Sequence, residues 1–389
     1  VLLGPELDFV SNTDIKIQNK IFKQIHPNIK SNVKDESVDC EGLLLIPGFI
    51  NAHTHIGDSI GKDVTLNSSV NKKIHPVFGV KSKILKNTFE PNLANFMKNT
   101  CYSMIQKGIT TFVDFREGGL DGVTLLKKVL SDVPLRCIIL GRIEFYQGTN
   151  EIKKNLPFPK EKVKDLTTLL KECHGLGISG ANENSTSVLN YYSKTTQLRA
   201  IHSSETKQSI SVSKKITGIS ETQRALSLKP DFLVHMTHAS KDDLSTVAQK
   251  TKGIVICPRA NASLAEGIPD IELMQKTGCT IALGTDNVMI NSPDMFREMD
   301  FLWKVTMGIH KKRINPKEIL KMATVNGGKI LKKDIGMIKT GKIADCIFLD
   351  KHALDLEPMH NPHASIVHRA SESTIKAVMI GGTLVHGKL

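Results

Sequence analysis

Eight short apolar runs recur through the middle of the chain. Most are nearly continuous, which is typical of strands buried on both faces of a parallel sheet. The segments between them repeat apolar residues every three to four positions, which indicates amphipathic helices. In one such segment the pattern ends at Gly108, a residue that commonly terminates helices. The eight runs span residues 42–53, 110–115, 135–143, 175–181, 197–204, 231–237, 253–259 and 280–286.

Eight alternating strands and helices in about 240 residues predict a (β/α)8 barrel. A doubly wound parallel sheet is the alternative, because periodicity alone does not separate the two. Both ends of the chain instead alternate apolar and polar residues and are rich in turn residues. We therefore expect residues 1–47 and 336–389 to form the two parts of one small β-sandwich, with the barrel between them at 48–335.

Polar side chains gather where the apolar runs end. In an extended strand, residues i and i+2 point to the same face, so the histidines of an H-x-H pair can converge on one point. Because the carboxyl ends of barrel strands form one mouth, where active sites are built, these polar residues are expected to meet there. His53 and His55 come at the first run, His202 and Glu205 at the fifth, His235 at the sixth, Arg259 and Asn261 at the seventh, and Asp286 at the eighth.

Three imidazoles and one carboxylate suit a borderline divalent metal, Zn²⁺ or Fe²⁺. A metal in such a site lowers the pKa of a bound water, so that hydroxide forms near neutral pH. Glu205 lies three residues beyond His202 and could carry protons as a general acid and base. His235 could polarise the electrophile or orient the hydroxide.

Four segments together resemble the amidohydrolase superfamily, in particular its branch of nucleoside-type deaminases and s-triazine hydrolases. They are "PGFINAHTH", "HSSE", "LGTDN" and, near the carboxyl end, "GMIKTGKIADCIFLD". The resemblance spans essentially the whole chain. It implies a distorted barrel with one catalytic metal, zinc or alternatively iron, and hydrolysis at a carbon that bears a nitrogen or halogen leaving group. It also implies an oligomer of identical subunits.

The same resemblance implies roles for individual residues. The metal ligands would be His53, His55, His202 and Asp286. Asp286 would also take a proton from the metal-bound water, and Glu205 would protonate a ring nitrogen. His235, rather than His238, would fill the catalytic position of the sixth strand.

Departures from the family pattern leave some features open. Members with two metals bridge them through a lysine on the fourth strand, and "GISGANENS" has none, which favours one metal. Another branch uses a glutamate of the third strand as a ligand. Glu144 lies near that place, although it could instead pair with Arg142.

Three further residues are candidates for substrate contact. The fork of Arg259 suits a carboxylate or phosphate, and Asn261 stands beside it, but an arginine that ties two loops together is an equally good interpretation. His75 lies in the long segment after the first run, where a lid would sit.

Composition narrows the choice of partners. The net charge is +13, but the lysine clusters are short, only 5% of residues are aromatic, and no nucleic-acid-binding motif is present. Solvated lysine-rich faces are the better interpretation, so we expect no nucleic-acid partner. No apolar run approaches the roughly 20 residues of a membrane helix, so we expect no membrane partner. The seven cysteines are scattered without a C-x-x-C pair, which indicates reduced thiols in a cytoplasm-like compartment.

Three functions remain in competition. The leading hypothesis is hydrolytic deamination of a small amino-substituted heterocycle, of purine, pyrimidine or pterin type. The second is opening of a cyclic amide or imidazolone ring with the same machinery, as in imidazolonepropionase. The third is an inactive barrel that acts as a binding protein.

Overall fold

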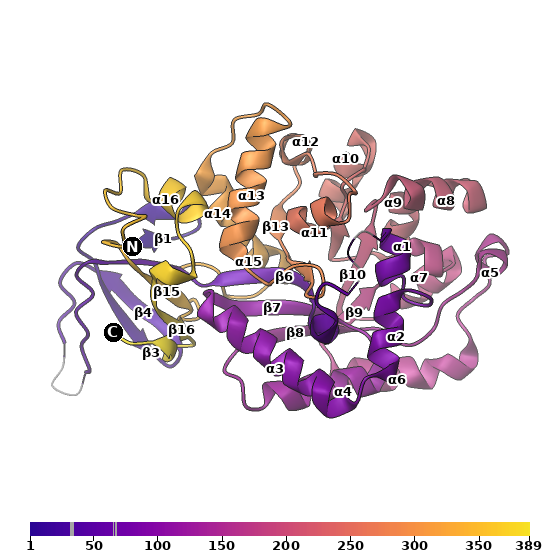
Figure 1. Cartoon of the computed structure of the whole chain (residues 1–389), viewed down its shortest axis with the longest axis horizontal. Coiled ribbons are helices and arrows are strands. Elements are labelled where there is room, and N and C mark those ends of the chain that lie inside the picture. Colours follow the sequence, from indigo (N-terminus) through magenta and orange to yellow (C-terminus); the bar gives the residue numbers. More distant parts are fainter. Residues whose placement is uncertain (32–34, 65, 67) are drawn as a thin grey trace.

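The computed structural model describes residues 1–31, 35–64, 66 and 68–389. Its centre is a parallel sheet of nine strands in the order β13-β12-β11-β10-β9-β8-β7-β6-β14 (Figure 1). The strands are β6 (Phe49–His55), β7 (Ile109–Arg116), β8 (Arg136–Gly141), β9 (Gly175–Ile178), β10 (Leu198–Ser203), β11 (Phe232–His235), β12 (Gly253–Ile256), β13 (Ile281–Leu283) and β14 (Asp286–Asn287). Seven whole strands and one divided strand therefore correspond to the eight predicted runs.

The divided eighth strand closes the sheet into a barrel. Its first half, β13, pairs with β12, and its second half, β14, pairs with β6 at the opposite edge. Only Gly284 and Thr285 separate the halves; the Gly284 amide donates to Ile256 O at 2.9 Å, and the Thr285 amide donates to His53 O at 3.1 Å. The predicted barrel is thus confirmed, and the doubly wound alternative is wrong.

Helices follow the strands around the outside of the barrel. In α3, Met97, Cys101, Met104 and Ile105 are buried, which is the apolar stripe that the sequence predicts. The helices are α1 (Val70–Ile74), α2 (Val80–Asn87), α3 (Glu90–Gln106), α4 (Gly119–Leu130), α5 (Thr149–Lys153), α6 (Val163–Glu172), α7 (Thr186–Tyr192), α8 (Lys207–Thr217), α9 (Glu221–Ala225), α10 (Lys241–Lys250), α11 (Pro258–Ser263), α12 (Ile271–Lys276), α13 (Met295–Gly308), α14 (Pro316–Ala323), α15 (Val325–Leu331) and α16 (Pro362–His368). Within the described residues, no helix has the length and apolar character needed to cross a membrane.

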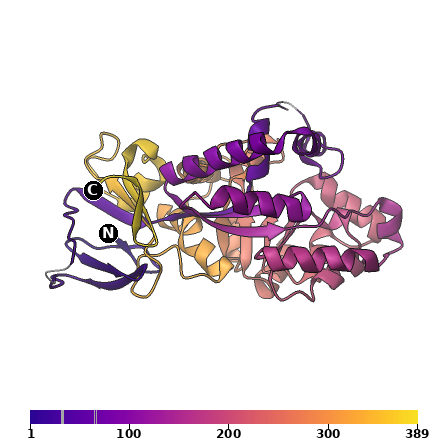
Figure 2. The same ribbon diagram turned by 90° about the horizontal axis from the view of Figure 1, so that it is seen from below.

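Small antiparallel sheets are built from both ends of the chain, which lie at the same end of the molecule (Figures 1 and 2). Four strands pair in the order β17-β16-β15-β5, and two further pairs are β3-β4 and β1-β2. Phe22, Leu45, Cys346 and Phe348 are buried together in their core. The strands are β1 (Leu2–Leu3), β2 (Asp8–Phe9), β3 (Asp14–Gln18), β4 (Ile21–His26), β5 (Leu43–Pro47), β15 (Cys346–Asp350), β16 (Ile375–Ile380) and β17 (Thr383–Gly387).

The predicted first strand, 42–53, is wrong as a single element. It divides at Gly48 into β5, which pairs with β15 of the terminal sheet, and β6 of the barrel. A side chain at Gly48 would come within 2.3 Å of Thr110 Oγ1, so the chain passes against β7 as it changes sheets. Both halves are apolar because both are buried, and the apolar pattern therefore does not reveal the division.

Candidate metal centre and active site

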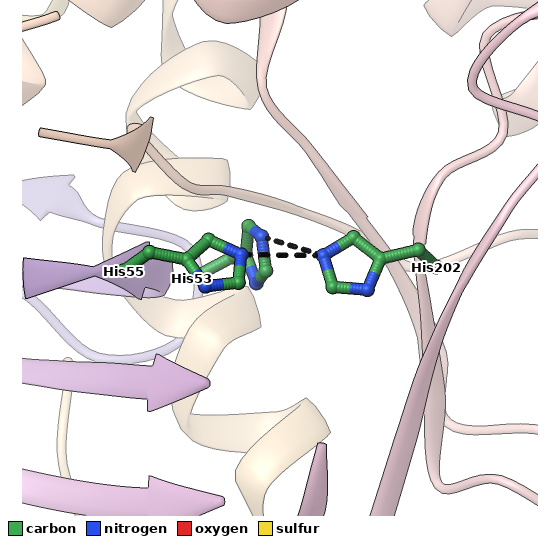
Figure 3. Close-up of side chains that lie close together, drawn as sticks. All are labelled: His53, His55 and His202. Carbon is green, nitrogen blue, oxygen red and sulfur yellow. Dashed lines mark hydrogen bonds between the residues drawn. The ribbon is translucent and has the colours of Figure 1, made fainter. Parts of the chain in front are cut away.

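Three imidazoles meet at the carboxyl ends of β6 and β10 (Figure 3). His202 Nε2 lies 3.2 Å from His53 Nε2 and 3.4 Å from His55 Nε2. Asp286, from β14, joins them: its Oδ1 lies 3.2 Å from His53 Nε2 and 3.6 Å from His55 Nε2. Four side chains that are far apart in the chain therefore present four donor atoms to one point.

Hydrogen bonds at the far side of two rings aim their Nε2 atoms inward. His202 Nδ1 donates to Ile178 O at 2.9 Å, and His55 Nδ1 lies 3.1 Å from Phe115 O. When Nδ1 carries the proton of a neutral imidazole, Nε2 carries the lone pair. Burial, the largest cause, lowers the pKa of His202 well below its ordinary value and that of His53 to about 3, so both rings are neutral.

The donor set fits a divalent cation. Ligands bound at about 2.0–2.1 Å around a tetrahedral ion lie roughly 3.3–3.4 Å from one another. The separations of His53 and His55 from His202 and from Asp286, at 3.2–3.6 Å, are close to this value. Lone pairs this close repel each other unless a proton or a cation lies between them. His53 Nδ1 and Asp286 Oδ2 are, in addition, buried with no hydrogen-bond partner. These contacts support a site for a divalent metal ion.

Backbone strain collects at the same mouth. Ser204, His235 and Asp286 have φ values of +52°, +71° and +62°, in the left-handed region that residues with a side chain seldom adopt. Each such residue costs on the order of 1–3 kcal/mol and persists where the surrounding structure enforces it, often at functional sites. All three lie at the ends of barrel strands, next to or among the converging side chains.

Glu205 and His235 form a second pair beside the first group. Glu205 Oε2 lies 3.7 Å from His235 Nε2, while Glu205 Oε1 is buried without a partner. Burial raises the pKa of Glu205, which favours a carboxyl group that can hold a proton. Asn261 contacts His235 Nδ1 at 3.4 Å and so fixes the ring. His235 also has a ring nitrogen within 4.8 Å of donor atoms of both His53 and Asp286, so it stands close to the metal position.

A cavity opens directly onto these groups. Its interior, without the open solvent at its mouth, has about 120 Å³ of space that water-sized molecules can enter. His55, His202, Glu205, His235 and Asp286 line one part of the wall. The rest of the wall is strongly polar and includes His75, Lys81, Glu117, Arg142, Glu183 and Glu221.

Of the three residues predicted to contact the substrate, one lines the cavity and two do not. His75 lines the cavity and stacks on Phe78, with ring centroids 3.6 Å apart. Arg259 does not line it: its Nη1 contacts Glu298 Oε1 and Ser292 O, at 3.3 and 3.2 Å, so it ties two segments together. Asn261 is absent from the wall as well and contacts His235 instead. A direct substrate contact by Arg259 or Asn261 is therefore not supported by the geometry.

Two alternatives raised by the sequence have other partners. Glu144 is exposed, and its Oε1 accepts a hydrogen bond from the Gly118 amide at 3.1 Å; it belongs to neither group of potential metal ligands found among the described residues. His238 Nε2 contacts Glu266 O at 2.6 Å, away from the converging imidazoles. The structure thus favours His235 over His238.

The sequence interpretation missed a charged group behind His55. Glu117 Oε1 lies 2.8 Å from His55 Nδ1 and 2.5 Å from Lys81 Nζ, and Lys81 also contacts Asp58. Glu117 follows a barrel strand directly, as the recognised residues do. The rule that polar residues at strand ends build the mouth would have found it, but Lys81 carries no such signal because it lies on a helix after the first barrel strand.

The chain belongs to the Amidohydrolase family, whose model it matches over residues 44–385. The prediction drawn from the sequence motifs, a hydrolase of the amidohydrolase type, is therefore confirmed.

Relatives cover nearly the whole chain. A protein of Methanothermobacter thermautotrophicus is 34% identical over 99% of this chain and 97% of its own length. The 5-methylthioadenosine/S-adenosylhomocysteine deaminase of Thermoanaerobacter pseudethanolicus is 29% identical over 98% of this chain and 90% of its own.

Two solved structures share the fold. An adenosine deaminase from Xanthomonas campestris with bound zinc superposes with a TM-score of 0.82, at 18% identity, over 96% of this chain and 88% of its own. Atrazine chlorohydrolase TrzN from Arthrobacter aurescens, complexed with zinc, gives a TM-score of 0.84 at 15% identity, over 96% of this chain and 90% of its own.

Proposed function

We propose that this chain is a metal-dependent hydrolytic deaminase of a small amino-substituted heterocycle. The observation that carries the proposal is the position of Glu205, whose Oε1 is buried without a hydrogen-bond partner, in the wall of a cavity that is also lined by His55, His202 and Asp286. Such a site can deliver a proton to a substrate at the place where water is activated.

The proposed metal ligands are His53, His55, His202 and Asp286. A divalent ion held by them would supply a water of lowered pKa as the nucleophile. Zinc is the proposed ion because three nitrogen donors and one oxygen donor suit it, and because the adenosine deaminase and the chlorohydrolase with this fold are described with zinc.

The remaining residues move protons and hold groups in place. Asp286 Oδ2, which has no hydrogen-bond partner, accepts the proton that the attacking water loses. Glu205 donates a proton to the ring nitrogen beside the carbon under attack. His235, fixed by Asn261, orients the attacking water or polarises that carbon. The proton on Asp286 then passes to the amino group, the carbon–nitrogen bond breaks and ammonia leaves, while the hydroxyl proton returns to Glu205 as the ring carbonyl forms.

The relatives support a deaminase over other hydrolases. The relative from Thermoanaerobacter pseudethanolicus and one from Pyrococcus furiosus, which is 27% identical, are both named 5-methylthioadenosine/S-adenosylhomocysteine deaminases. Both alignments span at least 98% of this chain. We therefore propose an aminopurine derivative as the first substrate class to test.

Ammonia release is the decisive assay. Zinc-loaded protein is incubated with aminopurines, their nucleosides, aminopyrimidines and aminopterins, while a coupled enzyme records ammonia and the ultraviolet spectrum reports whether the ring survives. We expect ammonia with an intact ring from at least one aminopurine, and none from the H202A variant. Ring opening without ammonia would favour the cyclic-amide hydrolase, and a fully metallated protein with no turnover of any substrate would favour a binding protein.

A further inference from the structure

Helix α2 (Val80–Asn87) is attached to the barrel through a buried charge. Along this helix only Lys81 and Ser82 are buried. The Lys81 ammonium lies 2.5 Å from Glu117 Oε1 and 3.4 Å from Asp58 Oδ2. Lysine is rarely buried unless it is paired. The contact with Glu117 and Asp58 is therefore one attachment of this helix, beside the half-buried Val80, Ile84 and Leu85.

The same carboxylate holds His55. Glu117 Oε1 lies 2.8 Å from His55 Nδ1, and Glu117 Oε2 accepts from Arg116 Nη2 at 3.1 Å. Glu117 thus lies among the Lys81 ammonium, the Arg116 guanidinium and the ring of His55, whose Nδ1 also has Phe115 O as a partner at 3.1 Å.

We propose that Glu117 is a positioning residue that joins the metal centre to helix α2, so that metal binding at His55 and docking of α2 through Lys81 stabilise each other. The inference rests on the metal centre of the proposed function. It concerns the carboxylate beside His55, which is not one of the four proposed metal ligands.

The direction of the effect follows from the contacts. A carboxylate beside the Nδ1–H of a histidine ligand stabilises that tautomer and makes its Nε2 a stronger donor. A cation bound at Nε2 in turn makes Nδ1–H more positive and so strengthens its electrostatic attraction to Glu117 Oε1, 2.8 Å away. By linkage, whatever stabilises Glu117 in this position, including Lys81, must favour metal binding, and the metal must favour the docked helix to the same extent.

The segment that contains α1 and α2 forms part of the cavity wall. Val70 and Ile74 of α1, together with His75 and Lys81, line its wall. Figure 1 shows α1 and α2, in indigo, as two neighbouring helices outside the sheet. A metal-dependent attachment of α2 would therefore complete the cavity wall when the enzyme is loaded and loosen it when the metal is absent.

Zinc affinity without substrate gives the first test. The E117Q variant keeps the shape of the side chain but loses the charge, and we expect its zinc affinity to fall roughly 10- to 100-fold in competition with a chromophoric chelator. E144Q is the matched control: its parent carboxylate accepts from the neighbouring Gly118 amide and contacts neither His55 nor Lys81. Its affinity is expected to equal that of the parent. E117Q binding zinc as tightly as the parent would overturn the inference.

Amide hydrogen exchange gives the second test. In the parent, zinc is expected to slow exchange over residues 80–87, and in K81M this protection is expected to vanish although Glu117 still contacts His55. If zinc protects α2 equally in the parent and in K81M, the proposed link is wrong. If E117Q does not fold, the double variant K81M/E117Q, which lacks both charges, takes its place. We expect this double variant to bind zinc more weakly than the parent.

The two proposals fail in different ways. A parent protein that does not bind zinc would contradict the metal centre itself. A parent that binds zinc tightly, with E117Q unchanged, would contradict only the role of Glu117.

Discussion

The surroundings of two carboxyl groups at the mouth of the barrel shift their pKa values in opposite directions. Burial would raise the pKa of Asp286, but its hydrogen bond with His53 and the neighbouring imidazoles hold it far below the ordinary range. Glu205 lies 3.7 Å from His235, and burial raises its pKa. When neighbouring carboxyls differ in this way, one remains an anion that can take up a proton and the other can hold a proton to donate.

The role of Glu205 leads to a prediction about the E205Q variant. Because an amide cannot deliver the proton, we expect kcat to fall by about 10²- to 10⁴-fold, with zinc content equal to that of the parent. Steady-state kinetics and elemental analysis of the same sample measure both quantities. An E205Q enzyme with near-parental kcat would exclude Glu205 as the acid.

Glu298 predicts a dependence of stability on pH. Burial raises its pKa to about 8, although Arg259 lies close by, whereas an unfolded glutamate titrates near 4.5. Between these values the folded state retains a proton that the unfolded chain has lost, so the stability contributed by this group falls as pH rises. E298Q cannot ionise and should become more stable relative to the parent from pH 5 to pH 8.

Thermal melting of metal-free parent and E298Q across this pH range measures the effect. The exposed Glu172, paired with Lys127, offers a control in E172Q, whose offset from the parent should not grow with pH. A constant offset between E298Q and the parent would contradict the assignment.

At the residue level the sequence predicted much of the site. His53, His55, His202, Glu205, His235 and Asp286 could be selected because each falls at a strand end. The structure brings the last five to one cavity, and the buried His53 contacts His202 and Asp286. Their metal-binding and catalytic roles stay predictions. For Arg259 the sequence left two interpretations open, because an arginine at a strand end can turn either inward or toward a neighbouring segment; here it contacts Glu298 outside the cavity.

Among the strands and helices, the divided eighth strand has the most direct effect on the site. The step from β13 to β14 passes so close to β6 that a side chain at Gly284 would lie 2.7 Å from His53 Cβ and 2.9 Å from His53 N. The absence of a side chain at Gly284 thus allows the barrel to close directly against a proposed metal ligand.

G284A is therefore expected to disturb both the fold and the metal centre. Forcing one methyl group into such packing typically costs about 1–3 kcal/mol, and the displaced His53 should weaken zinc binding. G308A is the control, since an added methyl there meets no atom within 4 Å. Denaturant melts and chelator competition compare the two; equal behaviour of both variants would contradict the packing argument.

The apolar runs located the strands well because such runs indicate buried segments, and the barrel strands are buried. Each predicted run overlaps a barrel strand, including the run at 280–286, whose division at Gly284 was not foreseen. The pattern was misleading at 42–53, where two buried strands of different sheets follow one another. Which strand pairs with which depends on contacts across the sheet, and these are invisible in the local sequence.

The barrel and the terminal sheets are held together at the scale of the whole molecule. Arg136, at the start of β8, pairs with the buried Asp345, and Asp345 Oδ1 also accepts from the Gly381 amide at 2.8 Å. The division into segments 1–47, 48–335 and 336–389 stays a prediction, as do the assembly of identical subunits and the cytoplasmic location.

Metal binding is expected to stabilise the whole chain. A ligand that binds only the folded state adds about 2.7 kcal/mol when its free concentration is 100 times its dissociation constant. Chelation should therefore lower the melting temperature of the parent, and zinc should restore it. H202A is expected to show neither effect. If zinc does not change the melting temperature of the parent, the proposed metal site is wrong.

Anomalous diffraction at the zinc absorption edge tests the central claim most directly. The account predicts one peak per chain, bonded at about 2.0–2.2 Å to Nε2 of His53, His55 and His202 and to a carboxylate oxygen of Asp286. A zinc-loaded crystal with no peak among these four side chains, or with its zinc bound elsewhere, would contradict it.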